Sequence, residues 1–392
     1  MKTPHSLQPS RVLLATAALL TLSLQIGRAQ SPGQNVDHGL QIEKAQTTGK
    51  LTPLTMYIGG RALAQDAPAN KPFGSKTYTY QWPGAYFTAS FHGPEVYFRV
   101  GDGRQILHVV IDEQPPRVLI KPEPGIYRIS GLAAAAHTVR IEVVTESQSA
   151  PETFDGFALS RPATALPAPR HERQIEFIGD SHTVGYGNSS GKRQCSPDEI
   201  WATTDNSQAF GPLTAMHYHA DYQVNAISGR GIVRNYNGFP ADTLPQAYPY
   251  VLFDKRNAYR DGAWRPQVIV IALGENDFST PLNPGERWKT RDELHADYEA
   301  TYAKFLADLR SHDPGAFFIL WATDAAGGEI QTEVQRVIAQ RNADGDNRIA
   351  FIPVNGLSMS ACDWHPSVAD DELISGKLRD FLDSHPELWP GK

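Results

Sequence analysis

The feature that most constrains the fold of this chain is a change of pattern near residue 174. Before it, short runs of β-branched and aromatic residues follow one another without a convincing helical period. After it, apolar runs alternate with longer amphipathic stretches. Because each pattern needs its own hydrophobic core, we expect the 392 residues to form two domains.

The first half of the chain has the texture of an antiparallel β domain. Its strand-like runs, which lie between residues 54 and 159, are YTYQW, YFTASF, EVYFRV, ILHVVID and TVRIEVV. Turn-forming Gly, Pro and Asp separate them, as in WPG, HGP, GDG and EPG. Short strands at this spacing predict a small all-β sandwich of the jelly-roll type over residues 37–160, with at most one turn of helix at LAAAAH (132–137).

The second half alternates strands with helices. Residues 161–172 hold three prolines and little apolar surface, which predicts a semi-rigid linker before a domain over residues 173–392. The expected strands are IEFIGD, YQVNAIS, VIVIAL, AFFILWAT and IAFIPV, and the expected helices cover 208–220, 291–312, 329–343 and 369–385. Nearly continuous apolar strands joined by helices predict a mostly parallel sheet covered on both faces, an α/β fold of three layers.

The N-terminal segment is expected to lie outside the fold. Lys2 and Arg11 flank an apolar stretch that ends near Ile26, and small residues follow up to Ala29. This pattern is typical of a signal peptide over residues 1–29. A membrane anchor is the alternative, but the apolar run is shorter than the ~20 residues that a span requires. We therefore expect a secreted or periplasmic protein without stable membrane insertion.

Charge and cysteine content argue against several classes of function. The formal net charge is −7 without a dense basic cluster, so no nucleic acid partner is expected, because phosphate binding needs a cationic face. No His/Cys cluster has ligand spacing, so no metal is expected. In an oxidising compartment the two cysteines, Cys195 and Cys362, are expected to form a disulfide rather than remain free thiols.

Four short motifs follow strands of the second domain. They place Ser181 in GDSH, Gly229 in SGRG, Asn276 in LGEND and His365 in CDWHP. Each motif is weak in isolation, because turns, helix caps and single histidines are commonly structural. Their order is informative, because parallel strands end at one edge of a sheet and ligands bind there. Convergence at that edge would bring together a nucleophile, two oxyanion donors and a base.

With these motifs the sequence resembles the SGNH, or GDSL-type, hydrolases, which carry Ser, Gly, Asn and His in this order. A closer resemblance is to carbohydrate esterase family 2, the acetyl xylan esterases and related sugar acetylesterases, in which a small jelly-roll domain precedes the SGNH domain. The matching segments are WPGAYFTASFHGPEVYFRV, FIGDSHTVGYGN, ISGRGIVRNY, LGENDFS and CDWHPS, which span about residues 73–367.

The resemblance implies a serine esterase that needs neither metal nor organic cofactor. Ser181 would be the nucleophile and His365 the base. The backbone N–H groups of Ser181 and Gly229 and the side-chain amide of Asn276 would form the oxyanion hole.

The sequence offers two alternative acceptors for the Nδ1–H of His365. The wider SGNH pattern has Asp three residues before the histidine, where this chain has Cys362, and the nearest acid is Asp363. Either the Asp363 carboxylate or a backbone carbonyl near it is expected to accept the Nδ1–H of His365. A Cys195–Cys362 bridge would tie this loop to the loop after Ser181.

The resemblance implies removal of acetyl groups from plant cell-wall polysaccharide or its oligosaccharides. Sugar rings stack on aromatic side chains, and those near the motifs are Tyr236, Trp288, Trp321 and Trp364. Core or rim packing is an equally good interpretation of each. Two other functions stay open: an esterase for a lipid, simple acyl ester or wall glycan, and a carbohydrate-binding protein with a degenerate hydrolase domain.

Overall fold

The fold is described from a computed structural model in which residues 39–46, 50–67, 76–101 and 103–389 are described. These described residues belong to one compact unit. The expected signal peptide lies outside the described residues. Among the helices of the described ranges, none has both the length and the apolar character that crossing a membrane requires.

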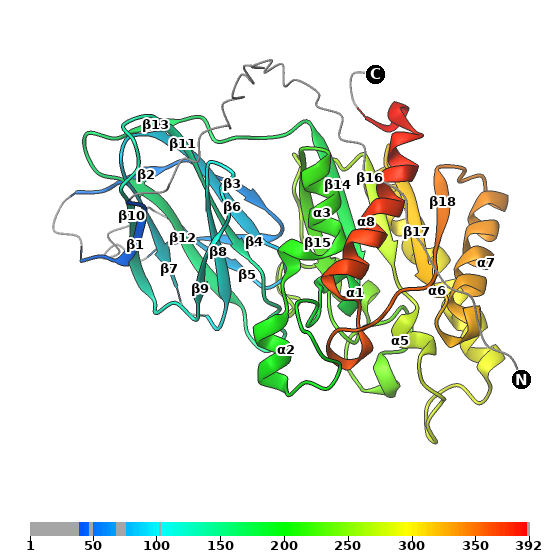
Figure 1. Ribbon diagram of the computed structural model, residues 1–392. Helices are drawn as coiled ribbons and strands as arrows, with labels where there is room; N and C mark the ends of the chain where they lie inside the picture. Colours follow the sequence, from blue (N-terminus) through cyan, green and yellow to red (C-terminus); the bar gives the residue numbers. More distant parts are fainter. Residues whose placement is uncertain (1–38, 47–49, 68–75, 102, 390–392) are drawn as a thin grey trace, which may run out of the picture. The chain divides into compact units, whose positions relative to one another are not determined.

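The N-terminal half is a β-sandwich (Figure 1). Its strands are β1 Gln41–Lys44, β2 Thr52–Leu54, β3 Tyr57–Gly59, β4 Ala62–Asp66, β5 Lys76–Tyr80, β6 Tyr86–His92, β7 Val96–Val100, β8 Ile106–Ile111, β9 Arg117–Ile120, β10 Gly125–Ser130, β11 Ala136–Val143, β12 Glu152–Leu159 and β13 Thr164–Leu166. One antiparallel sheet has the order β1-β10-β7-β12-β5-β4, with β2 on β12. The other has the order β13-β6-β11-β8-β9, with β3 on β6.

Side-chain alternation explains why these strands form a sandwich. Along β6, Phe87, Ala89 and Phe91 enter the core between the sheets, and the residues between them face away. The predicted all-β domain is therefore confirmed. The predicted helical turn at 132–137 is wrong: β11 begins at Ala136 and pairs with β6 and β8, because tertiary pairing overrides the helix propensity of alanine.

Part of the expected linker also belongs to this sandwich. Within residues 161–172, β13 pairs with β6, so that Thr164 lies opposite His92 and Leu166 opposite Ser90. The domain boundaries themselves stay a prediction.

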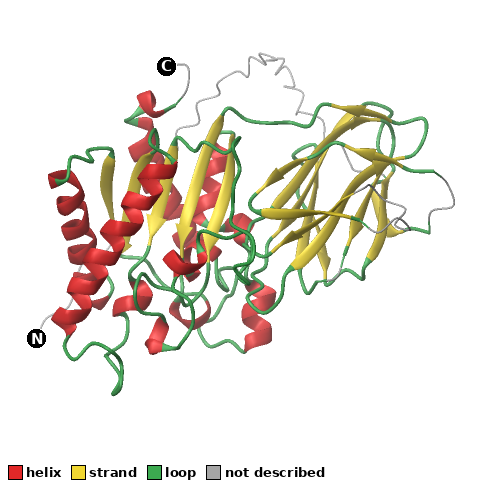
Figure 2. Ribbon diagram, turned by 180° about the vertical axis from the view of Figure 1, so that it is seen from behind, coloured by secondary structure: helices red, strands yellow, loops and turns green. Residues whose placement is uncertain are grey.

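The C-terminal half is a three-layer α/β/α structure (Figure 2). Its five parallel strands are β14 Arg173–Gly179, β15 Ala220–Ala226, β16 Val268–Ala272, β17 Phe317–Thr323 and β18 Ile349–Val354, in the order β15-β14-β16-β17-β18. One face carries α3 Phe210–His217 and α8 Val368–Asp383, and the other carries α6 Arg291–His312 and α7 Glu329–Ala343. The predicted fold class is confirmed.

Shorter helical segments lie between these elements or follow the last of them. They are α1 Ser181–Val184, α2 Pro197–Thr203, α4 Leu244–Ala247, α5 Glu275–Phe278, η1 Asn206–Gln208, η2 Tyr236–Gly238, η3 Ala326–Gly328, η4 Cys362–Trp364 and η5 Pro386–Leu388.

Burial on both faces explains the continuous apolar strands. On β16, Val268 and Val270 pack under α3 and α8, whereas Ile269 and Ile271 pack under α6 and α7. Burying each such side chain contributes about 1.5–3 kcal/mol. Because β14 lies between β15 and β16, the segments after these three strands meet at one edge.

The sandwich contacts the parallel sheet through buried polar side chains. Arg61 pairs with Glu176 on β14 at 3.4 Å, and both side chains are 1% exposed. Arg140 on β11 lies 3.5 Å from the ring centre of Tyr86 and donates to the Tyr222 hydroxyl on β15 at 3.0 Å. Since separating a buried ion pair is costly, these contacts keep the sandwich docked on the sheet.

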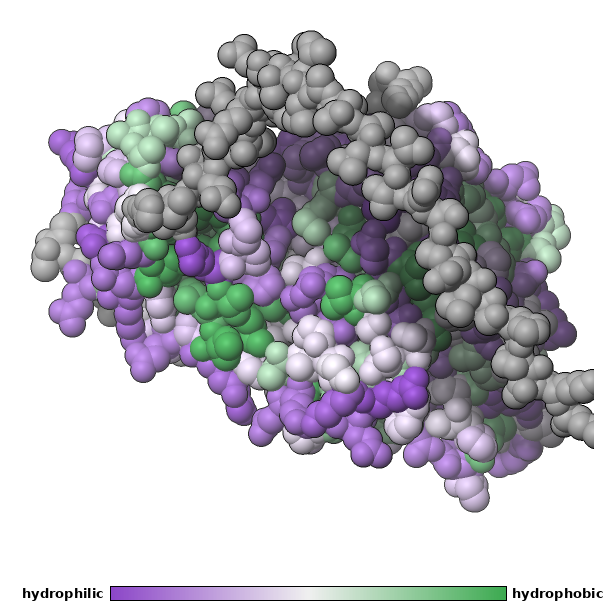
Figure 3. All heavy atoms as spheres, viewed as in Figure 1, coloured by the Kyte–Doolittle hydropathy of each residue, from purple (hydrophilic) through white to green (hydrophobic). Residues whose placement is uncertain are grey.

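Most of the face seen in Figure 3 is hydrophilic, with apolar side chains gathered over part of the sandwich. On the edge strand β9, Val118 and Ile120 are 51% and 65% exposed. This strand has only four residues, and short edge strands offer little template for pairing with another chain.

Candidate active site

Three of the four motif residues follow adjacent strands at the carboxyl edge of the parallel sheet. Ser181 follows β14, and Gly229 and Asn276 follow its neighbours β15 and β16. His365 lies in the segment between β18 and α8 and contacts Ser181. The structure thus brings the expected nucleophile and base together.

Ser181 is the first residue of α1 and is 5% exposed. Asp180 caps this helix, since its Oδ1 accepts the N–H of His182 at 3.1 Å. The turn requires Gly179, because a Cβ there would lie 2.0 Å from the Oγ1 of Thr183. No hydrogen bond within the described part of the chain uses the Ser181 N–H. The Ser181 hydroxyl and N–H therefore belong to one rigid turn.

His365 has the geometry of a general base. Its Nε2 lies 2.9 Å from the Ser181 Oγ, and its Nδ1 lies 2.9 Å from the Cys362 carbonyl oxygen and 3.2 Å from that of Asp363. Because Nδ1 faces only acceptors, it carries the proton and leaves Nε2 free to accept from the serine. Burial, with a contribution from nearby His182, lowers the pKa of His365 to about 4, so the ring is neutral at neutral pH.

Of the two acceptors that the sequence left open for the Nδ1–H of His365, the Asp363 carboxylate is not the one observed, so Asp363 does not complete a triad through its side chain. Its Oδ2 accepts the Tyr186 hydroxyl at 3.1 Å. Asp363 and Trp364 both have positive φ, 51° and 59°. This left-handed turn directs main-chain carbonyls toward the ring of His365, at a cost of about 1–2 kcal/mol per residue. The backbone alternative is the one in the structure.

The loop that carries His365 is held by covalent and main-chain contacts. Cys195 and Cys362 form a disulfide, and the N–H of Asp363 donates to the Arg193 carbonyl at 2.6 Å. Gly187 has φ +56°, and a Cβ there would lie 2.5 Å from the Cβ of Cys362. The chain after the nucleophile therefore packs directly against the chain before the base.

The two other expected oxyanion donors lie in the segments that follow β15 and β16, the strands on either side of β14. Gly229 has φ +80°, and within the described residues its N–H has no hydrogen-bond acceptor. The Asn276 amide donates at 3.0 Å to both the Asp180 Oδ2 and the Arg230 carbonyl. Asp180 thus connects the start of the nucleophile helix to the side chain of Asn276, a link that the sequence analysis missed.

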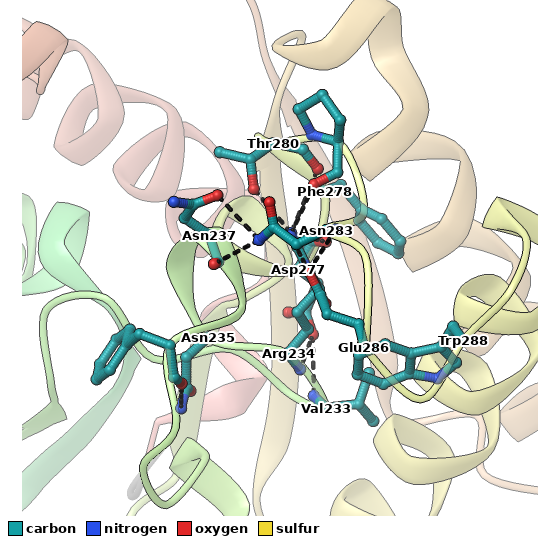
Figure 4. A network of polar contacts seen from close by, with 12 residues as sticks. Val233, Arg234, Asn235, Asn237, Asp277, Phe278, Thr280, Asn283, Glu286 and Trp288 are labelled. Atoms are coloured by element: carbon teal, nitrogen blue, oxygen red, sulfur yellow. Dashed lines mark hydrogen bonds and ion pairs between the residues drawn. The ribbon is translucent and has the colours of Figure 1, made fainter.

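Asp277, the neighbour of Asn276, holds the loop that follows Gly229 (Figure 4). Its carboxylate accepts three consecutive N–H groups at 2.9 Å, those of Ile232, Val233 and Arg234. Burial raises the pKa of Asp277 to about 6, although the three N–H groups act in the opposite direction. The segments that carry the two expected donors are therefore fastened together.

A buried ion pair extends this network (Figure 4). The Arg234 guanidinium binds both carboxylate oxygens of Glu286, at 2.7 and 3.0 Å, and donates to the Thr280 hydroxyl at 2.8 Å. The Arg234 side chain is 1% exposed. Bidentate pairs of this kind add geometric specificity as well as energy, so the loops after β15 and β16 behave as one unit.

The four aromatic residues proposed for sugar stacking have different environments. Trp364 and Tyr236 are 59% and 54% exposed. Trp288 packs against the core, and its indole N–H donates to Asp297 at 2.9 Å. Trp321 is 2% exposed within the layer under α3 and α8. The expectation for Trp321 is therefore corrected, because a fully packed ring presents no face to a sugar.

Three side chains near the motifs escaped the sequence analysis. Glu146 and Gln148, in the sandwich, bond to the main chain of Ser228. Phe239 is 38% exposed and lies beside Gly229, where an added Cβ would approach its ring to 3.3 Å. Glu146 and Gln148 belong to a polar loop of the other domain, which gives no sequence signal for such contacts.

This arrangement suits acyl transfer. A serine hydroxyl lies 2.9 Å from a neutral imidazole, and within the described residues the main-chain N–H groups of Ser181 and Gly229 have no acceptor. Within the described ranges, no group of three or more His, Cys, Asp or Glu side chains is placed to hold a metal ion.

Two family models match the chain. Residues 73–169 match the one described as carbohydrate esterase 2 N-terminal, and residues 177–386 match the GDSL-like lipase/acylhydrolase family. A protein of Cellvibrio japonicus named acetylxylan esterase / glucomannan deacetylase is 46% identical over 338 residues, which cover 86% of this chain and 93% of that protein. The cellulase/esterase CelE of Acetivibrio thermocellus is 29% identical and is covered over 40% of its length, against 86% of this chain.

Solved structures agree with these matches. One, described as a carbohydrate esterase whose active site displays divergent catalytic and non-catalytic binding functions, has a TM-score of 0.82 and 45% identity, over 86% of this chain and 100% of that one. A family two carbohydrate esterase from Clostridium thermocellum in complex with cellohexaose has a TM-score of 0.71 and 25% identity, over 85% and 100%. With the GDSL-like match covering more than half of its residues, this chain belongs to the GDSL-type hydrolases and, within them, to the esterases of carbohydrate esterase family 2.

Proposed function

We propose that the protein is an exported carbohydrate O-acetylesterase that deacetylates plant cell-wall polysaccharide or its oligosaccharides through an acetyl-serine intermediate. The observation that carries the mechanism is the 2.9 Å approach of His365 Nε2 to Ser181 Oγ, with Nδ1 held by the Cys362 carbonyl. The substrate class is supported by the relative named acetylxylan esterase / glucomannan deacetylase, at 46% identity.

In the first step, the Ser181 Oγ attacks the acetyl carbonyl carbon while His365 Nε2 takes the hydroxyl proton. Negative charge develops on the carbonyl oxygen, which accepts the N–H groups of Ser181 and Gly229 and the Asn276 amide. Since both hydrogens of that amide have protein acceptors in the structure, the oxyanion would replace the Arg230 carbonyl as one of them.

In the second step, His365 gives its proton to the departing sugar hydroxyl, and the C–O bond to the sugar breaks. Water then attacks the acetyl-enzyme, His365 accepts a proton from that water, and acetate leaves as Ser181 is protonated again. The Nδ1–H of His365 stays on the main-chain carbonyl throughout. Ser181 and His365 thus act as a dyad.

Exposed aromatic rings next to the proposed catalytic residues would bind the sugar. Trp364 precedes His365 directly, and Tyr236 lies in the loop after Gly229. Their exposed faces suit stacking on a pyranose ring. Export rests on the signal-peptide pattern of residues 1–29 and leaves periplasm and medium as the two destinations.

The test is acetate release from acetylated xylan, acetylated glucomannan and an aryl acetate. We expect the wild type to release acetate and Ser181→Ala to lose at least about 10⁴-fold in kcat. Ser311→Ala, on the exposed surface of α6, is the matched control and should behave as wild type. Full activity of Ser181→Ala, or a folded wild type that cleaves none of the three esters, would contradict the proposal and turn attention to carbohydrate binding by the sandwich.

A further inference from the structure

The β-sandwich reaches the oxyanion side of the site through the loop between β11 and β12. Glu146 Oε1 accepts the N–H of Ser228 at 2.8 Å, and Gln148 Nε2 donates to the Ser228 carbonyl oxygen at 3.1 Å. The two side chains also bond to each other, since Gln148 Nε2 lies 3.1 Å from Glu146 Oε1. Both main-chain polar groups of Ser228 are thus held by the sandwich.

Ser228 directly precedes Gly229, and this links the sandwich to the oxyanion hole. The Ser228 carbonyl and the Gly229 N–H belong to one planar, trans peptide unit, so they point in opposite directions. A side chain that holds this carbonyl therefore sets the direction of the Gly229 N–H. Within the described residues that N–H has no acceptor of its own to hold it.

The loop that supplies these two side chains is itself anchored. The Val144 carbonyl accepts the N–H of Asn206 at 2.9 Å, and the Thr145 hydroxyl accepts the N–H of Ile106 at 3.3 Å. Ser228 is 8% exposed, and hydrogen bonds to a group so shielded from water are costly to lose. The loop is therefore held in place independently of Ser228, and its position determines that of the Ser228 main chain.

We propose that Glu146 and Gln148 are positioning residues that aim the oxyanion donor of Gly229, so that the sandwich completes the active site. The inference rests on the proposed esterase function. This positioning role differs from simply holding the sandwich against the second domain. Two other contacts already do that away from the motifs, Arg61 with Glu176 and Arg140 with Tyr222. Loss of a contact that only holds the domains together would lower the melting temperature, whereas loss of a contact that orients the Gly229 N–H would lower kcat.

The experiment compares Glu146→Ala, Glu146→Gln and Gln148→Ala in the full chain, with kcat and KM for an aryl acetate and the melting temperature of each. Glu146→Ala should lower kcat about ten- to one-hundred-fold, because the Gly229 N–H is still present but is no longer held in the right direction. Its KM should stay within about three-fold of the wild-type value. Glu146→Gln keeps an oxygen that accepts the Ser228 N–H and should recover most of kcat. Gln148→Ala should fall between them.

Glu152→Gln is the matched control, because Glu152 is a 3% exposed carboxyl of the same sandwich. It should leave kcat unchanged even if it alters the melting temperature. A second readout is the affinity for methylboronic acid, which forms a tetrahedral adduct with a nucleophilic serine. For the Glu146 and Gln148 variants this affinity should fall in parallel with kcat.

Three results would overturn the inference: a folded Glu146→Ala variant with wild-type kcat, a loss confined to KM, or equal losses in Glu146→Ala and Glu146→Gln. If Glu146→Ala does not fold, the kcat and boronate affinity of Gln148→Ala decide in the same way. Failure of the function itself has a different signature, because the wild type would then release no acetate, or Ser181→Ala would remain active.

Discussion

The two sides of the active site are held in place by different chemistry. On the base side, the Cys195–Cys362 disulfide and main-chain carbonyls fix the histidine. On the oxyanion side, the carboxyl groups of Asp180, Asp277 and Glu146 fix the donors. A main-chain carbonyl does not titrate and is not removed by a side-chain substitution. A carboxyl group titrates and can be removed by one. The base should therefore tolerate side-chain changes that the oxyanion hole does not.

Burial deepens this contrast. It raises the pKa of Glu146 and Asp180 above their usual range, and that of Asp277 to about 6. A buried carboxyl that binds N–H groups is expensive to replace, because its partners are left without an acceptor. On the base side, the Asp363 carboxylate is exposed and, among the described residues, accepts a side-chain hydrogen bond only from the Tyr186 hydroxyl.

Among the substitutions that test this comparison, the largest loss of kcat is expected at Asn276. Removing its amide in Asn276→Ala should lower kcat about 10²–10³-fold, the loss typical of one oxyanion donor. Steady-state kinetics with an aryl acetate measures it. Asn342→Ala, which changes an exposed asparagine of α7, is the control. A loss of less than about five-fold at Asn276 would mean that its amide serves only Asp180 and Arg230.

A smaller effect is expected in the pH profile. Because burial lowers the pKa of His365 to about 4, kcat/KM should fall about tenfold per pH unit only below that value. The neighbours of the ring are His182, Tyr186 and Asp363. An acid limb with its midpoint near 6.5, the ordinary pKa of histidine, would contradict the assigned environment.

The same pKa carries a stability consequence. With a folded-state pKa near 4 and an ordinary value of 6.5, the unfolded chain binds more protons between these pH values. The contribution of His365 to the free energy of unfolding is therefore complete above pH 6.5 and declines as the pH falls toward 4.

The strong local patterns of the fold were predictable from sequence. The helices at 291–312 and 329–343 and the strand at 349–354 begin and end where the amphipathic and apolar runs do. Thr290 marks one start by accepting the N–H of Glu293. Six short strands of the sandwich, β1 to β4, β9 and β13, were missed, because three to five residues carry too little periodicity and their pairing is set by tertiary contacts. The longer strands β10 and β12 were also not among the expected runs, and a register shift against β7 interrupts the regular pairing of β12.

The site divides in the same way. Ser181 and His365 were predictable, because order along a parallel sheet determines which residues meet. The Nδ1 acceptor was left open between two groups, because it depends on the left-handed φ angles of Asp363 and Trp364. Glu146 left no trace in the sequence, because it bonds to a residue 82 positions away in another domain.

The most direct test of the central claim, that the main chain orients the base, is kcat/KM of Asp363→Asn. Asparagine tolerates the left-handed φ of this position, so the variant keeps the backbone and removes only the charge. The prediction is a loss of less than about five-fold, since the exposed hydrogen bond between Tyr186 and Asp363 contributes at most about 1 kcal/mol. Tyr186→Phe, which removes the same bond, should lose about as much. A loss of about 10⁴-fold, as for the aspartate of a catalytic triad, would contradict the account.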